Sequence, residues 1–187
     1  MENNYFKKAQ IYIVGVVSLA ICGLLAWDYF HGGVPAHHIL NKKDLPEISN
    51  WWGGLLLPSL TWFLVYSIQK REKLTNKNWA SFSNFPKKII YGFAGALALS
   101  LSIAVLFTFD VHGIPGYLLM AALAFSFFYP IYRAECLIGF VIGMTYTFGG
   151  VLPIGIGCIL AAFGFLSYNI IRPGVLFLAN FLFRKGK

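Results

Sequence analysis

Charged residues are scarce in this sequence. They make up 12% of the 187 residues, whereas hydrophobic residues make up 58%, and the mean hydropathy is +0.66. A chain of this composition cannot cover its surface with polar side chains, which excludes an ordinary water-soluble domain. The composition therefore predicts an integral membrane protein whose main partner is the lipid bilayer.

The motifs of the common enzyme classes are missing as well. The sequence has no Gly-x-Ser-x-Gly elbow, no phosphate-binding loop and no dinucleotide fingerprint. Its three cysteines, Cys22, Cys136 and Cys158, show neither CxxC pairing nor the spacing of metal ligands, so they indicate packing. We therefore predict no catalytic residue and favour a protein that is not an enzyme.

Six stretches of the chain lack Asp, Glu, Lys, Arg and His altogether. They are residues 9–27, 51–69, 89–109, 116–132, 136–148 and 151–171. A helix needs about 20 apolar residues to cross a hydrocarbon core of about 30 Å, and about 17 are tolerated. Five of the stretches reach this length, and residues 136–148 predict a shorter crossing. The fold class is thus an all-α bundle of six transmembrane helices.

A pattern of Gly, Tyr, Ile and a basic residue recurs three times with identical spacing. The copies are Gly53/Tyr66/Ile68/Lys70, Gly116/Tyr129/Ile131/Arg133 and Gly155/Tyr168/Ile170/Arg172. The 13 residues from each Gly to its Tyr rise about 20 Å as a helix, so the two ends of the pattern mark opposite membrane faces. Aromatic and basic side chains are typical interfacial anchors. The predicted anchors are Tyr66, Lys70, Tyr129, Arg133, Tyr168 and Arg172.

The repeat indicates one helical hairpin used three times within a single transmembrane domain, residues 1–187. The predicted hairpins are residues 9–70, 89–133 and 136–172, with a cytoplasmic insertion at 73–88 and a cytoplasmic tail at 173–187. With the N-terminus inside, 13 of the 15 basic residues lie in inner segments. The positive-inside rule therefore predicts both termini in the cytoplasm. These inner loops account for the net charge of +8, so nucleic acid is not an expected partner. The short loops and the absence of an N-glycosylation acceptor in the outer segments favour a bacterial inner membrane.

The residues most able to bind a metal or to titrate near neutral pH lie on the predicted outer face. They are Asp28, His31, His37, His38, Asp110 and His112. The Asp28/His31 and Asp110/His112 pairs occupy corresponding corners of two adjacent hairpins, and imidazole and carboxylate groups are suitable ligands for zinc or another divalent metal. The same histidines are candidates for a pH sensor. Solvated interfacial side chains are the third interpretation.

The predicted spans contain small and hydroxyl-bearing residues but no ionisable ones, which argues against coupling to ions or protons within the membrane. Gly139 and Gly143 have the four-residue spacing that lets helices approach closely, which favours tight packing or self-association. Together with Thr145, Tyr146 and Thr147, they are also candidates for lining a pore for a neutral solute.

These features favour a non-enzymatic channel or transporter for a small solute, or a subunit of a homo-oligomer or larger membrane complex. In that hypothesis, the outer face with its His and Asp residues serves recognition or pH gating. The alternative is a membrane metal-binding protein or metalloenzyme that uses the outer histidines. The outer insertion, residues 36–52, is the first candidate region, because function often resides where a scaffold is interrupted.

Overall fold

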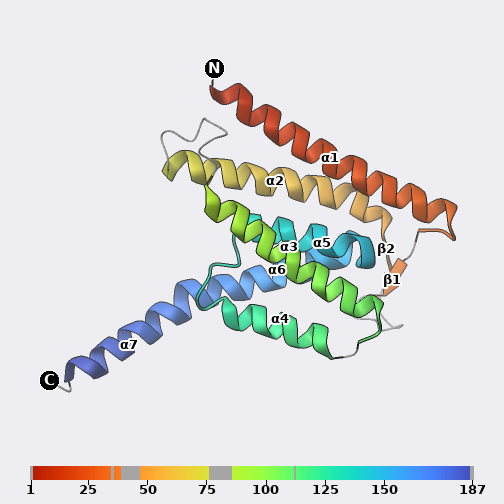
Figure 1. Ribbon diagram of the computed structural model, residues 1–187. Coiled ribbons are helices and arrows are strands. Elements are labelled where there is room, and N and C mark those ends of the chain that lie inside the picture. Colours follow the sequence, from red (N-terminus) through yellow and green to blue (C-terminus); the bar gives the residue numbers. More distant parts are fainter. Residues whose placement is uncertain (1, 35, 39–46, 76–85, 112, 186–187) are drawn as a thin grey trace.

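The computed structural model describes residues 2–34, 36–38, 47–75, 86–111 and 113–185, and almost all of them are helical (Figure 1). The elements are α1 (Glu2–Phe30), β1 (Ala36–His38), β2 (Glu47–Ser49), α2 (Trp51–Thr75), α3 (Lys87–Thr108), α4 (Ile114–Phe125), α5 (Ala134–Phe148), α6 (Val151–Leu166), the π-helical turn η3 (Ser167–Ile171) and α7 (Arg172–Lys185). β1 and β2 form a small antiparallel pair in which His37 lies opposite Ile48. The end of the bundle that carries this pair is called the β end below.

Four of the described helical segments are long and apolar enough to cross a membrane. They are α1, α2, α3 and the continuous segment that runs from α6 into α7, whereas α4 and α5 are apolar but shorter. The prediction of a helical chain built from long apolar helices is therefore confirmed.

The central helix is α5, which packs on α2, α3 and α6 (Figure 1). Nine of its 15 residues are buried, among them Val141 and Met144 in the main apolar core. Its main partner is α3, which comes close because glycines of α5 place no side chain between the two helices. A β-carbon on Gly139 would collide with the carbonyl oxygen of Phe93.

At the β end, the first and third predicted hairpins touch through their backbones. A β-carbon on Gly53 would lie 3.0 Å from the α-carbon of Gly150, so these two glycines are packed face to face. α1 packs beside α2, and its residues Ile21 and Leu25 join the same core as α5. The contact between Gly53 and Gly150 fixes the position of the α2 N-terminus relative to the turn between α5 and α6.

The structure departs from the predicted helix over residues 116–132. α4 ends at Phe125, and residues 126–133 form turns with hydrogen bonds such as that from Ile131 N to Tyr129 O, at 2.8 Å. Pro130 explains the break, because proline has no N–H to donate and disfavours the helical conformation at the residue before it. The prediction of one continuous helix is wrong for this segment.

The segment after residue 171 is helical, where the sequence indicated only a tail. α7 continues the direction of α6 through η3 and projects away from the bundle (Figure 1). In η3, the Arg172 N–H donates to the Ser167 carbonyl, five residues earlier. Pro173 accounts for a disturbance at this point, because it cannot donate to the Asn169 carbonyl four residues before it.

Candidate functional site

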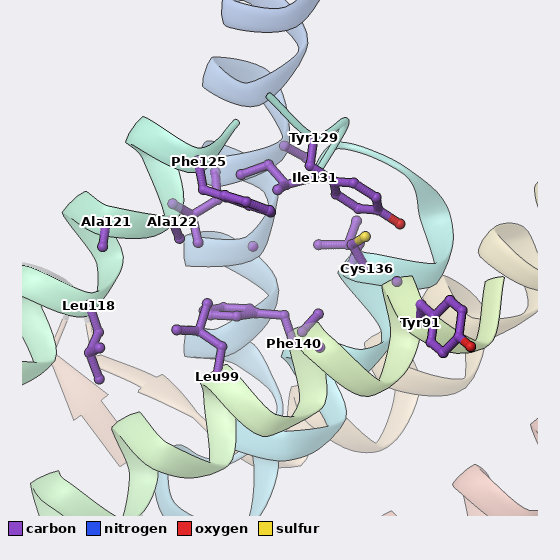
Figure 2. A pocket seen from close by; sticks show the side chains of 17 residues that line it. Tyr91, Leu99, Leu118, Ala121, Ala122, Phe125, Tyr129, Ile131, Cys136 and Phe140 are labelled. Atoms are coloured by element: carbon purple, nitrogen blue, oxygen red, sulfur yellow. The ribbon is translucent and has the colours of Figure 1, made fainter. Parts of the chain in front are cut away.

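An apolar cavity of about 600 Å³ lies between α3, α4, α5 and α6 (Figure 2). Its lining comprises Tyr91, Gly92, Gly95, Ala96 and Leu99 of α3, Leu118, Ala121, Ala122 and Phe125 of α4, Tyr129 and Ile131 of the α4–α5 connection, Cys136, Leu137 and Phe140 of α5, and Gly157, Leu160 and Ala161 of α6. None of these side chains carries a formal charge, so the cavity is suited to a hydrocarbon group.

The faces of α3 and α4 that line this cavity have the residue spacing of a packed core, but the two helices do not pack closely enough to fill the space between them. On α4, residues 118, 121, 122 and 125 follow the three- and four-residue steps of a helix face, yet no residue of α4 is buried. The facing positions on α3 are small, and nothing lies within 4 Å of where a β-carbon on Gly95 would stand. Small residues usually bring membrane helices together. Here they leave a gap.

The side chains at the two ends of the cavity differ. Figure 2 shows Phe125, Tyr129 and Ile131 gathered at one end, with Leu99 and Leu118 toward the other. The Tyr129 hydroxyl oxygen is buried and has no hydrogen-bond partner among the described residues. A phenol hydroxyl can both donate and accept a hydrogen bond, so this end of the cavity offers one polar group.

A buried ion pair adjoins the Tyr129 end of the cavity. The Arg71 guanidinium on α2 donates from Nη1 to Oε2 and from Nη2 to Oε1 of Glu135, both at 3.1 Å, and from Nε to Glu72 Oε1 at 3.2 Å. The Glu135 side chain is 1% exposed and that of Arg71 is 33% exposed. A β-carbon on Gly92 would lie 2.9 Å from Glu135 Cγ and 3.1 Å from the Tyr129 hydroxyl, so glycine leaves room for both.

Reasoning from the sequence missed this ion pair, because it placed Arg71 and Glu135 in solvated inner loops. The sequence did contain one indication that Glu135 is buried. Glu135 precedes Gly139 and Gly143 at four-residue steps, so all three share the helix face that packs on α3. A carboxylate on that face must be buried, and it then requires a cationic partner.

The predicted outer residues that the structure describes lie at the β end and form no cluster of three metal ligands. The exposed His31 ring stacks on Trp27 with centroids 3.9 Å apart, and its Nδ1 lies 2.9 Å from the Trp27 carbonyl oxygen. Asp28 is half-buried on α1, and Asp110 follows α3 with a positive φ of 57°. His37 and His38 are adjacent in β1, and His112 lies outside the described residues. No group of three potential metal ligands occurs within the described part of the chain.

The candidate pore residues of α5 are mostly engaged in packing. Gly139 and Gly143 face α3, and the buried Thr145 hydroxyl donates to the Val141 carbonyl at 2.7 Å. Tyr146 is 83% exposed, and Thr147 lines a smaller pocket at the β end.

The predicted anchors have three different local structures. Tyr66 and Lys70 are exposed on α2, whereas Tyr129 and Arg133 belong to the turns between α4 and α5. Tyr168 lies in η3, and the Arg172 guanidinium carbon is 4.7 Å from the centre of its ring. The repeated spacing therefore does not correspond to a repeated conformation.

Comparison with protein-family models, curated proteins and solved structures found no match to this chain.

Proposed function

We propose that this protein is a multi-pass membrane protein that binds the hydrocarbon chain of a lipid in the cavity between α3, α4, α5 and α6. The single observation that carries the proposal is the uncharged lining of this cavity, which has about 600 Å³. Ligand pockets in proteins commonly enclose about 300–1,000 Å³ and are lined mainly by apolar and aromatic groups. In a bilayer, lipid chains are the apolar molecules present at high concentration around these helices.

The membrane arrangement that accompanies this proposal has both termini in the cytoplasm. The distribution of basic residues supports it, since 13 of the 15 lie on the proposed inner side. The β end then faces outward, and Arg71 and Glu135 lie near the inner surface. α5 is short, but its neighbours α2, α3 and α6 shield it from lipid.

α4 has 12 residues and rises about 18 Å, which is less than a hydrocarbon core of about 30 Å. We infer that residues 126–133 complete this crossing. Their irregular backbone makes hydrogen bonds within the segment, as the bond from Ile131 N to Tyr129 O at 2.8 Å illustrates. Irregular backbone at membrane depth requires such internal partners.

Lipid binding is better supported than a pore along α5. A pore would need polar groups that are free to contact a solute. Gly139 and Gly143 are instead covered by α3, and the Thr145 hydroxyl is bonded within its own helix.

The test fills the cavity from a position where a side chain meets no obstacle. Gly95→Leu adds a side chain in open space, and Gly15→Leu is the matched control, because Gly15 also has nothing within 4 Å but lies on α1. Delipidated protein is incubated with phosphatidylcholine, and retained lipid is counted by native mass spectrometry. We expect the wild type and Gly15→Leu to retain a phospholipid and Gly95→Leu to lose about 90% of it, since the added side chain occupies the same volume. Equal retention in all three proteins would exclude this cavity as the binding site.

A further inference from the structure

A second hollow, of about 220 Å³, lies at the β end between the last turns of α1, Asn50 and the end of α5. Its lining comprises Ile21, Leu24, Leu25, Trp27, Asp28, Asn50, Thr145, Tyr146, Thr147, Gly149 and Gly150. In contrast to the lipid cavity, this pocket combines apolar side chains with a carboxylate, an amide and hydroxyl groups. We propose that it binds a small primary amine in its protonated, cationic form. This inference does not depend on the proposed lipid binding.

Asn50 is a buried polar residue of the pocket. It is 4% exposed, and it lines the hollow together with Gly149. Its side-chain amide offers both a hydrogen-bond donor and an acceptor to a ligand in the hollow. The Oδ1 atom of Asn50 can accept a hydrogen bond from an ammonium group.

The position of Asn50 is fixed by backbone contacts. Its carbonyl oxygen accepts a hydrogen bond from Gly53 N at 2.8 Å, which begins α2, and Gly53 is packed against Gly150. Its amide covers Gly149, whose φ of 70° favours glycine and whose missing side chain leaves the space that the amide occupies. The pocket is therefore built by the packing of α2 against the α5–α6 turn.

Asp28 determines the charge of the expected ligand. It is the only formally charged residue in the lining, so the pocket favours a cation over a neutral or anionic molecule. A transition metal would need three or four ligands, and the described residues contain no such group. An ammonium group needs only one carboxylate and a few hydrogen-bond acceptors. Trp27 and Leu24 supply apolar surface for the attached carbon chain, and the indole face also attracts cations.

The size of the pocket limits the ligand to a small amine. Sites for drug-sized ligands commonly enclose about 300–1,000 Å³, so a hollow of about 220 Å³ holds a shorter molecule. Propylammonium is a suitable probe, and 1-propanol is its neutral analogue of similar size.

The test is isothermal titration calorimetry on the full-length protein in detergent. We expect saturable binding of propylammonium, no detectable binding of 1-propanol, and a dissociation constant about tenfold higher in Asp28→Asn, because the ion pair is lost while the shape is kept. Asp110→Asn is the matched control, since Asp110 is another aspartate at the β end but does not line the pocket. It should bind like the wild type.

Two outcomes would overturn the proposal. Binding of 1-propanol as strong as that of propylammonium would show that the charge is not recognised. An unchanged dissociation constant in Asp28→Asn would place the amine elsewhere. Because Asp28 is only partly buried and asparagine has nearly the same shape, this substitution is not expected to affect folding.

Discussion

At the scale of single residues, the most unusual group is the Glu135 carboxylate, which is almost completely withdrawn from solvent. Removing a carboxylate from water costs several kcal/mol, and a single guanidinium offsets this only when the geometry is good. Arg71 meets that condition, since it donates through both terminal nitrogens at 3.1 Å. The Arg71 side chain is one-third exposed, so water can solvate its charge without Glu135. The buried Glu135 carboxylate has no such alternative and depends more on Arg71.

This difference predicts unequal effects of removing each partner. Arg71→Met leaves Glu135 as a buried charge without its partner and should lower the free energy of unfolding by about 3–5 kcal/mol. Glu135→Gln should cost less, because the Arg71 guanidinium still reaches water. Chemical denaturation in detergent measures both variants.

The control for this pair is Lys70→Met, which removes an exposed cation one position earlier. It should change the free energy of unfolding by no more than about 0.5 kcal/mol. Equal losses in Arg71→Met and Glu135→Gln would show that the burial of Glu135 does not determine the cost.

At the scale of helices, the sequence predicted those elements that a long uncharged stretch is enough to identify. α1, α2, α3 and α6 fall where long uncharged stretches predict them. The Tyr-x-Ile-x-basic pattern could not predict conformation, because the residue after each tyrosine differs. Ser67 permits α2 to continue as an α-helix, whereas Pro130, at the equivalent position, lies in the turns that follow the end of α4 at Phe125.

The contacts between helices could not be predicted in the same way. Arg71 and Glu135 are 64 residues apart, and their pairing results from the packing of α2 on α5. Likewise, the cavity depends on the distance between α4 and α3. The periodicity of apolar residues in the sequence predicts which face of a helix is packed, but not this distance. The small residues of both faces are visible in the sequence, but they are equally compatible with close packing.

Two glycines distinguish close packing from open space at this scale. Gly139→Ala should destabilise the protein by about 1–3 kcal/mol, because the added methyl group meets the Phe93 carbonyl of α3. Gly95→Ala should instead raise stability by up to about 1 kcal/mol, since alanine is the better helix former and its methyl group enters empty space. Thermal unfolding of the two variants in one detergent provides the comparison. A loss of stability in Gly95→Ala would contradict the open gap beside α3.

At the scale of the whole molecule, the proposed arrangement in the membrane puts the β end outside. In a variant with Cys22, Cys136 and Cys158 replaced by alanine, a cysteine introduced at Asn41 should react with a membrane-impermeant maleimide on intact cells. A cysteine at Lys77 should react only after permeabilisation, because the positive-inside rule puts that segment in the cytoplasm. Labelling is read by gel mobility, and the reverse pattern would invert the proposed orientation.

Under the proposed lipid binding in the cavity between α3, α4, α5 and α6, the stability of the fold depends on the surrounding lipid as well as on the chain. A ligand that binds only the folded state stabilises it by about 2.7 kcal/mol when its concentration is 100 times its dissociation constant. In a bilayer, lipid chains are always in excess, so this contribution is permanently present. Extraction into a lipid-free detergent withdraws it. The native fold is then best regarded as a complex of one polypeptide and its lipid.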